Sequence, residues 1–518
     1  MRLLLSGRTL APDPTPESEP RAERRVLHWL LPLSIALLSL VYSLWVTLEV
    51  FERIPHNEDE LAFVFQSRVF AGGALSAPEP PQPHAFFAPF VIDLNRVRFG
   101  KYPPGFPLML APGSLVGAPW LVNPLLGAAS LALLYAFGAR YFSRPAGAVA
   151  ALLGAISPFF LEYSGSLMSH TATLFVSLLA IWFYADAWFK GSWRSALLCG
   201  ICFGLAFLSR PATALGLGAP FAVHALWLMS RGRVRSFGLP LLVGVVPLVI
   251  ALPLFNYAVS RQVLLSMYEL WWPFDRFGFG EGIGTLDRHT PEMGLRYVLL
   301  NVRQVAPILL GWPLAGTLAF GLFVAEVVML AATALWSFRP GAQRPLPRVL
   351  MLEALLVMSV ITLIIAYIPY WAPHPRYYYE GLGGFLLVSA LGALRLLGFI
   401  APPKPLRWAI AAGAGLVLAI GALTTSPDYL WTLHHKNFFT RERLDAVEQA
   451  GLTNALVMVV QEGDWSDYGS VFPANSPWLD GDVVYALSST PSTLRRLREQ
   501  FPDRVVYELR GSQLRRIN

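Results

Sequence analysis

Long uninterrupted hydrophobic runs recur along most of the chain. The run from Trp29 to Thr47 contains no charged residue. A helix needs about 20 residues to cross the roughly 30 Å hydrocarbon core of a bilayer. Lipid cannot satisfy backbone polar groups, so only helices or closed barrels span it. Because these runs are continuous and do not alternate with polar residues, they predict a bundle of transmembrane helices.

The hydrophobic runs predict about eleven membrane spans. They lie approximately at residues 28–49, 120–140, 146–163, 171–189, 195–214, 215–230, 237–257, 305–337, 349–371, 377–398 and 408–425. An odd number of spans puts the two ends of the chain on opposite sides of the membrane.

Basic residues indicate which side is cytoplasmic, because Lys and Arg gather in cytoplasmic loops. Arg21, Arg24 and Arg25 precede the first span, which lacks a small-residue cleavage site, so we expect an uncleaved span with a cytoplasmic N-terminus. Further basic clusters follow the even-numbered spans: Arg140 and Arg144; Lys190 and Arg194; Arg231, Arg233 and Arg235; Arg339, Arg344 and Arg348; Lys404 and Arg407.

This topology divides the chain into three parts. Residues 1–26 are rich in Pro, Glu and Ser and are expected to be a disordered cytoplasmic tail. Residues 27–425 form the membrane bundle, with outer loops at 50–119 and 258–304. The segment 426–518 contains strand-like and helix-like stretches in the order strand, strand, helix, strand, which predicts a small soluble α/β domain outside the cytoplasm. Those stretches are 455–460, 482–489, 492–501 and 504–510.

Composition excludes several function classes. Of the 518 residues 55% are hydrophobic and 14% charged, and the formal net charge of +7 is accounted for by the cytoplasmic loops. No basic stripe interleaved with aromatics is present, so we expect no nucleic-acid partner. The two cysteines, Cys199 and Cys202, lie within an apolar run without a second pair, and we expect them to be small buried hydrophobes.

Charge-bearing residues concentrate in the first outer loop. Glu58, Asp59 and Glu60 follow the first span, and "FGKYPPGFPLMLA" at 99–111 carries Lys101 beside a Pro-Pro-Gly turn. A solvated interfacial cluster is one interpretation of the acids. The other is a site for a substrate with a lipid tail and an anionic head, because a carboxylate, a lysine and amphipathic segments occur at one membrane face.

These motifs resemble those of the type C (GT-C) membrane glycosyltransferases, which include protein O-mannosyltransferases and the aminoarabinose transferases that modify lipid A. The resemblance rests on the acidic pair after the first span, the "KYPPG" segment and the following bundle, and it covers roughly residues 28–425. It implies a polyprenyl-phosphate sugar donor. Asp59 would be the catalytic base, Glu60 would complete the acidic pair, and Lys101 would approach the lipid phosphate. Glu58 leaves a one-residue ambiguity in this match.

Further residues fit the same scheme. In "HPRYYYEGL" at 374–382, Arg376 and Tyr377 resemble the element that faces the lipid phosphate, although an aromatic belt with a snorkelling arginine is the alternative. Arg210 lies far from the basic loops, and a charge at such depth costs about 2.5–3.5 kcal/mol or more, so it should face the bundle interior or a wet cavity. His170 occupies a turn where relatives often carry a second acid, and it is an acceptor or metal candidate with Glu58.

The chemistry explains why these residue types are needed. Transfer from a lipid phosphate requires deprotonation of the acceptor hydroxyl and neutralisation of the charge that develops on the departing phosphate. The sequence therefore predicts an integral-membrane glycosyltransferase of the cell envelope, a hexosyl- or pentosyltransferase acting at the extracytoplasmic face on a glycan, lipid or protein acceptor. The sequence does not decide whether a divalent metal ion is required as a cofactor. A lipid-linked glycan transporter or flippase and a noncatalytic membrane assembly subunit are the alternative classes.

Overall fold

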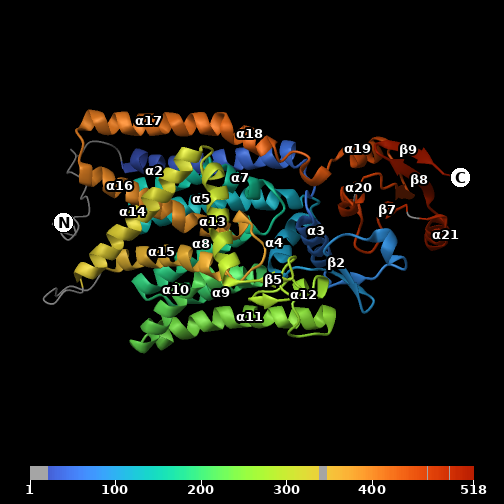
Figure 1. The fold of residues 1–518 in the computed structure, drawn as a ribbon, viewed down its shortest axis with the longest axis horizontal. Helices are drawn as coiled ribbons and strands as arrows, with labels where there is room; N and C mark the ends of the chain where they lie inside the picture. The colour runs from blue at the N-terminus through green and yellow to red at the C-terminus, as the bar shows by residue number, and fades with distance from the viewer. Residues whose placement is uncertain (1–20, 338–346, 464, 489, 518) are drawn as a thin grey trace.

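A bundle of long helices forms most of the molecule, with a smaller α/β unit at one end (Figure 1). The computed structural model describes residues 21–337, 347–463, 465–488 and 490–517. Residues 1–20 of the expected cytoplasmic tail and the basic residues Arg339 and Arg344 lie outside the described residues. Residues 21–26, which were expected to be disordered, are instead the first turns of α2 (Arg21–Trp45). The remainder has the predicted architecture, an all-α bundle of long apolar helices with a C-terminal α/β unit.

Nine helical segments among the described residues are long and apolar enough to cross a membrane. They are Leu30–Val50, Pro119–Tyr141, His170–Lys190, Pro211–Ser230, Val234–Ser260, Pro313–Ser337, Arg348–Ala366, Pro375–Ile400 and Lys404–Trp431. The pair α6 (Arg144–Ala155) and α7 (Pro158–Gly165) counts as a tenth segment if it is one span, and α9 (Trp193–Ser209) is a shorter apolar helix. The chain is a multi-pass membrane protein with nine or ten span-length segments among the described residues, compared with about eleven predicted; the predicted span at 195–214 corresponds to the shorter helix α9.

Proline and glycine account for the boundaries that differ from prediction. The segment predicted at 146–163 bends by 63° between α6 and α7, where Pro158 starts the second helix. The predicted 305–337 span is divided, because α13 (Pro291–Leu309) ends before Gly311, whose φ is +75°, and α14 (Pro313–Ser337) begins at a proline. Arg210 and Pro211 separate α9 from α10 (Pro211–Ser230), four residues before the predicted break.

The other long helices are α2 (Arg21–Trp45), α5 (Val122–Tyr141), α8 (His170–Lys190), α11 (Leu239–Ser260), α15 (Arg348–Ala366), α16 (Leu382–Ile400) and α17 (Lys404–Leu423). Small residues permit their closest approach. A Cβ on Gly200 of α9 would lie 2.2 Å from the carbonyl oxygen of Leu241 in α11, and a Cβ on Gly244 would lie 2.4 Å from that of Leu197. Glycine at both positions allows van der Waals packing of the two backbones.

The segment predicted to be the first outer loop, 50–119, contains α3 (Glu58–Ala71), β1 (Ala77–Pro78), β2 (Val91–Leu94), β3 (Val97–Gly100) and α4 (Gly105–Leu115). These strands form an antiparallel sheet in the order β1-β3-β2. The second outer loop contains α12 (Met267–Trp271), β4 (Gly280–Glu281) and β5 (Arg288–His289). Both loops lie at the end of the bundle that faces the α/β unit (Figure 1).

The C-terminal unit contains α19 (Glu442–Gln449), β6 (Ala455–Val459), α20 (Ser466–Gly469), β7 (Val483–Leu487), α21 (Pro491–Gln500), β8 (Val505–Arg510) and β9 (Gln513–Arg516). Its sheet has the order β7-β6-β8-β9, with β6 parallel to both neighbours and β9 antiparallel to β8. The predicted strands and helix are all present. The elements β9, α19 and α20 were not predicted from the sequence.

The first outer loop and the C-terminal unit share a hydrophobic core. Ala85 and Phe86, in the 3₁₀ turn Pro83–Phe86, pack against residues of the sheet and of α21, including Leu456, Val484 and Leu497. The ring of Phe65 in α3 also stacks on Phe472, with centroids 6.0 Å apart. The α/β unit therefore buttresses the loop that carries the predicted acids. α18 (Thr425–Trp431) connects α17 to this unit.

Candidate functional site

The predicted acids occupy the first turn of α3, and this position has a local structural reason. The Asn57 side chain accepts a hydrogen bond from the Glu60 amide at 3.0 Å, and the Glu60 carboxylate accepts one from the His56 amide at 2.8 Å. This reciprocal arrangement resembles a capping box. Negative charge is also favoured at a helix N-terminus. Local folding thus accounts for part of the acidic cluster, and the asparagine-x-x-glutamate pattern was visible in the sequence.

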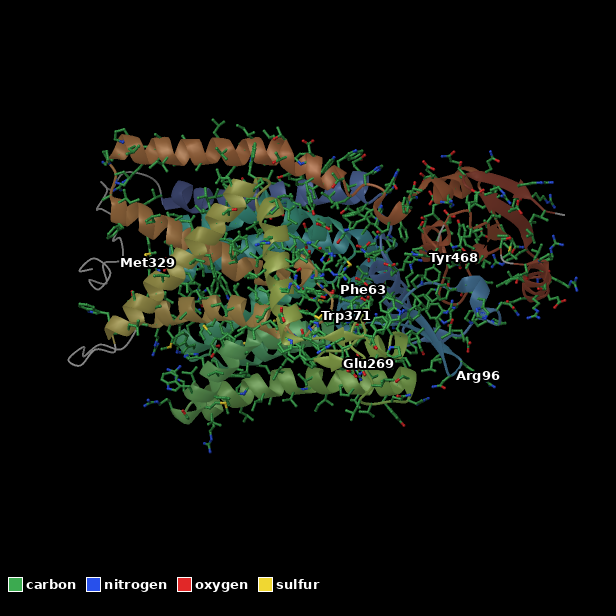
Figure 2. All side chains as sticks on the ribbon, viewed as in Figure 1. Phe63, Arg96, Glu269, Met329, Trp371 and Tyr468 are labelled. Atoms are coloured by element: carbon green, nitrogen blue, oxygen red, sulfur yellow. The ribbon has the colours of Figure 1, made fainter. Side chains whose placement is uncertain are left out.

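A cavity of about 710 Å³ lies between the two outer loops and the ends of the bundle helices. Its charged lining residues are Asp59, Lys101, Arg210, Glu269, Asp275, Arg276 and Arg376. Four cations and three carboxylates give the lining a formal charge of +1. Three of the lining residues, Phe63, Glu269 and Trp371, lie close together in Figure 2, at the end of the bundle next to the α/β unit.

Asp59 presents its carboxylate to this cavity between a cation and a phenol. Its Oδ2 lies 3.0 Å from Nη1 of Arg376, and its Oδ1 accepts a hydrogen bond from the Tyr102 hydroxyl. Burial, together with the neighbouring Asp59 charge, raises the pKa of Tyr102 well above its usual value, so the phenol stays a donor. The carboxylate is oriented from two sides, and it has lone pairs left for another donor.

Lys101 also lies at the cavity but is already paired. Its Nζ lies 2.9 Å from Oδ2 of Asp275, and it sits 4.2 Å and 4.4 Å from the ring centroids of Phe90 and Trp272. Burial lowers the pKa of Lys101, and the Asp275 charge opposes that shift. The Asp275 carboxylate additionally accepts hydrogen bonds from the Tyr370 hydroxyl and the Trp371 indole.

Arg210 and His170 meet at a second buried carboxylate. Oε1 of Glu380 lies 3.0 Å from Nε of Arg210 and 3.1 Å from Nδ1 of His170. Arg210 also donates to the Ser169 hydroxyl at 3.1 Å and reaches the cavity wall. His170 is fully buried behind that wall and is not among the lining residues.

Glu60 lines a different, smaller polar cavity of about 20 Å³. This cavity is also lined by Glu162, His374, Arg376 and Lys436, so Arg376 borders both cavities. Burial raises the pKa of Glu60 to about 7 and lowers that of His374 to about 3. Glu162 accepts a hydrogen bond from the Tyr429 hydroxyl at 2.9 Å and lies 3.3 Å from Lys436.

The structure therefore brings five of the predicted residues to one cavity and leaves three outside its wall. Asp59, Lys101, Arg210, Arg376 and Tyr377 line it. Glu58, Glu60 and His170 are not among its lining residues. Glu58 is partly exposed at the start of α3, one residue before Asp59.

Sequence reasoning missed the second outer loop as a wall of the site. Tyr268, Glu269, Trp272, Asp275 and Arg276 all line the cavity. Asp275 lies in the aromatic stretch "WWPFDRF" at 271–277, and an acid among aromatics next to a membrane span was the available signal. Glu380 follows three tyrosines and offered the same signal.

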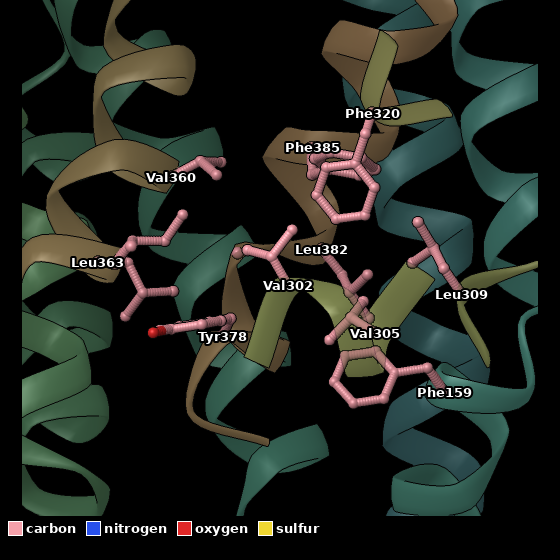
Figure 3. A pocket seen from close by; sticks show the side chains of 12 residues that line it. Phe159, Val302, Val305, Leu309, Phe320, Val360, Leu363, Tyr378, Leu382 and Phe385 are labelled. Carbon is pink, nitrogen blue, oxygen red and sulfur yellow. The ribbon is translucent and has the colours of Figure 1, made fainter. Parts of the chain in front are cut away.

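A separate apolar cavity of about 50 Å³ lies inside the bundle (Figure 3). Phe159, Val305, Leu309, Phe320 and Phe385 are among its lining side chains, and the Tyr378 hydroxyl is the one polar side-chain group in view. It contains no acid, base or cation, so it offers no acid–base chemistry. Tyr377 faces the charged cavity while Tyr378 faces this apolar one.

The charged cavity has the parts that group transfer to a hydroxyl requires. Asp59 can accept a proton, and Arg376, Arg276, Arg210 and Lys101 supply positive charge to an anion. Aromatic side chains, including Tyr268, Trp272 and Tyr367, provide apolar and stacking surface for a sugar or lipid.

The residues that could bind a metal ion lie outside the charged cavity. Among the described residues, Glu52, His434 and His435 form the group of potential ligands whose atoms lie within 4.8 Å of one another. This group includes neither of the metal candidates from the sequence, His170 and Glu58. The two cysteines are free and buried, as expected.

Comparison with known proteins gives a partial family match. Residues 112–257 match the family described as dolichyl-phosphate-mannose-protein mannosyltransferase. This segment begins after Asp59 and Lys101 and ends before Asp275 and Arg376. No curated protein matches the chain by sequence.

Two solved structures, both of one protein and with TM-scores above 0.5, share the fold. ArnT from Cupriavidus metallidurans bound to undecaprenyl phosphate is 16% identical, with 93% of this chain and 90% of that chain aligned at a TM-score of 0.54. The apo state of the same protein is 14% identical over 93% and 89% of the two chains, also at 0.54. The Archaeoglobus fulgidus oligosaccharyltransferase AglB, in complex with an inhibitory peptide and a dolichol-phosphate, is 14% identical over 93% and 70%, at a TM-score of 0.46.

Proposed function

We propose that this protein is an integral-membrane glycosyltransferase that moves a sugar from a polyprenyl-phosphate donor to an acceptor hydroxyl at the extracytoplasmic face. The observation that carries the proposal is the convergence of Asp59 and four cations on one 710 Å³ cavity. The shared fold with ArnT, a protein solved with undecaprenyl phosphate, supports a lipid-phosphate ligand of this class.

Asp59 is the proposed general base. The acceptor hydroxyl gives its proton to the Asp59 carboxylate as its oxygen forms a bond to the anomeric carbon of the sugar. The bond between that carbon and the phosphate oxygen breaks, and the electron pair stays on the polyprenyl phosphate. The hydrogen bond from Tyr102 and the ion pair with Arg376 orient the carboxylate.

The four cations at the cavity differ in whether they are already paired with a carboxylate. Arg276 is an exposed cation at the cavity and makes no ion pair among the described residues. Arg376 is 26% exposed and shares its charge with Asp59. Lys101 and Arg210 are held by Asp275 and Glu380. We infer that Arg376 and Arg276 contact the phosphate directly, through bidentate geometry, and that Lys101 and Arg210 add positive potential at the cavity.

The aromatic walls suit the remaining parts of the donor. Tyr377 lines the cavity and stacks on Tyr367 with 4.8 Å between ring centroids. Such faces pack against the apolar side of a sugar ring or the first isoprene units of the lipid. A glycan, a lipid or a protein could each be the acceptor, because each offers the hydroxyl that the mechanism requires.

The test uses purified protein in detergent with a panel of polyprenyl-phosphate hexoses and pentoses and candidate acceptors. Mass spectrometry should detect an acceptor heavier by one sugar residue and free polyprenyl phosphate in equal amount. Donor that moves across a vesicle membrane without any covalent product would support the transporter alternative instead.

A further inference from the structure

A second cluster of chemically active side chains lies outside the cavity, where the first span ends and the chain enters the C-terminal unit. Glu52 follows the last helical turn of the first span, and His434 and His435 follow α18. Each residue offers one potential ligand atom, a carboxylate oxygen or an imidazole nitrogen, and these three atoms lie within 4.8 Å of one another. The proposed transfer reaction uses none of these three residues.

The distances within the cluster do not correspond to hydrogen bonds. Oε1 of Glu52 lies 3.8 Å from Nε2 of His434 and 3.6 Å from Nε2 of His435. An N–H···O hydrogen bond has a donor–acceptor distance of about 2.7–3.2 Å. The two imidazole rings stack at a centroid distance of 3.7 Å, and Nε2 of each lies near the same carboxylate oxygen, Oε1 of Glu52.

These separations suit a bridging metal ion. A tetrahedral zinc ion with bonds of about 2.0–2.1 Å holds its ligand atoms about 3.3–3.4 Å apart. The observed distances from Oε1 to the two nitrogens exceed that value by only a few tenths of an ångström. Two imidazoles and one carboxylate are a ligand set for zinc and similar divalent transition ions, whereas magnesium and calcium prefer oxygen ligands.

The surroundings hold the three ligands in place. The other carboxylate oxygen of Glu52 accepts a hydrogen bond from the Arg441 amide at 3.0 Å, and the His434 ring stacks on Trp431 with an interplanar angle of 6°. The neighbouring Lys436 ammonium is directed to Glu162 at 3.3 Å, away from Glu52. The side chains of Glu52, His434 and His435 are 23%, 24% and 44% exposed, which leaves room for a water molecule as fourth ligand.

We propose that Glu52, His434 and His435 bind one divalent transition-metal ion, with zinc the best match, at the outer end of the first span. The ion would fasten the segment after α18 to the residues that precede α3. That segment also contacts the same region through Asn437, whose side chain donates to the His56 carbonyl at 2.8 Å. The site is structural and separate from the proposed transfer reaction.

Metal analysis of the full chain, purified in detergent without a histidine tag, tests the proposal. After loading with zinc chloride and desalting, the wild type should retain one zinc per chain by mass spectrometry of the elements. Glu52→Gln keeps an acceptor for the Arg441 amide and should bind zinc at least about 100-fold more weakly, since even partners outside the ligand shell typically contribute 10–100-fold. His434→Ala/His435→Ala should retain none.

The matched control is His84→Ala, because His84 is an exposed histidine outside the cluster. It should bind zinc as the wild type does, and zinc should raise the thermal unfolding midpoint of both proteins but not of Glu52→Gln. Cobalt in place of zinc should give the visible absorption of a four-coordinate ion. Equal zinc retention by the wild type and Glu52→Gln, or no retention above background by the wild type, would overturn the proposal and leave a metal-free cluster.

Discussion

Lys101 Nζ lies 2.9 Å from Oδ2 of Asp275, although 174 residues separate them in the chain. Both side chains are almost fully buried, at 2% and 3% exposed. Asp275 is also a hydrogen-bond acceptor for Tyr370 and Trp371. This one carboxylate therefore ties the first outer loop to the second and to the segment before Arg376, and all three contribute to the wall of the cavity.

Removal of Asp275 should destabilise the end of the bundle that carries the cavity. Asp275→Ala leaves the Lys101 ammonium buried without its counter-charge, and breaking a buried pair in this way costs about 3–5 kcal/mol. We expect a lower midpoint in thermal unfolding monitored in detergent. Lys101→Met/Asp275→Ala removes both charges and should recover much of that loss. A single variant as stable as the wild type would contradict the structural role of the pair.

The donor contacts predict a graded loss of affinity. Arg376→Ala removes a charge-assisted contact to the phosphate, worth about 1.5–3 kcal/mol, so binding of polyprenyl phosphate should weaken roughly 10- to 150-fold. Arg276→Ala should weaken it as well, because this cation lines the cavity and makes no ion pair among the described residues. Titration of the lipid into purified protein measures both effects.

The matched control for these arginines is Arg288→Ala. Arg288 is an exposed arginine of the same outer loop, in β5, and it does not line the cavity. Its affinity for polyprenyl phosphate should equal that of the wild type. If all three variants bound polyprenyl phosphate as tightly as the wild type, Arg376 would be interpreted as a snorkelling arginine in an aromatic belt and not as a phosphate contact.

The sequence predicted the bundle and much of the cavity because each rests on a local signal. Continuous apolar runs predict spans, and charge in an apolar run drew attention to Arg210. Asp59, Lys101 and Arg376 were recognised through short motifs. Asp275 and Glu380 were missed because their partners, Lys101 and Arg210, lie far away in the chain. The role of Glu60 in capping α3 was readable, since Asn57 and Glu60 have the capping-box spacing.

The buried Glu60 should make stability depend on pH. Burial raises the pKa of the Glu60 carboxyl group from its ordinary value of 4.5 to about 7 in the folded protein. Between pH 4.5 and pH 7 the folded state therefore retains the proton, whereas the unfolded state releases it. The stability linked to Glu60 is therefore present below about 4.5 and is lost as the pH rises toward 7. His56 and His374 act in the opposite direction, because burial lowers the pKa of each to about 4 and about 3.

Glu60→Gln separates these contributions, because glutamine keeps an acceptor for the His56 amide but does not titrate. Thermal unfolding midpoints of the wild type and the variant should diverge between pH 4.5 and 7, with the variant increasingly favoured, and the difference should level off above pH 7. A pH-independent difference would show that Glu60 does not titrate in this interval.

Membrane orientation yields a direct prediction. An N-terminus in the cytoplasm and eleven crossings put the cavity and the α/β unit on the outer side. A reporter active only outside the cytoplasm, fused after Arg510, should give a signal, and the same reporter in the loop near Arg233 should give none. The reverse pattern would put Asp59 in the cytoplasm and exclude the proposed use of an extracytoplasmic donor.

Asp59→Asn tests the proposed general base. Asparagine keeps the size of the side chain and an acceptor for Tyr102 but cannot take the acceptor proton, so turnover should fall about 10²- to 10⁴-fold. Binding of polyprenyl phosphate should persist or strengthen, because Arg376 loses the carboxylate that competes for its charge. Sugar transfer and lipid binding are measured on the same preparation.

The neighbouring acids are the controls for this experiment. Glu58→Gln should retain most of the activity, because Glu58 does not line the cavity. Glu60→Gln should be intermediate, because Glu60 fixes the first turn of α3 from which Asp59 projects. An inactive Glu58→Gln beside an active Asp59→Asn would move the base by one residue. Full activity in all three variants would remove the general base from this helix, and with it the mechanism, since a neutral amide at each position cannot accept the acceptor proton.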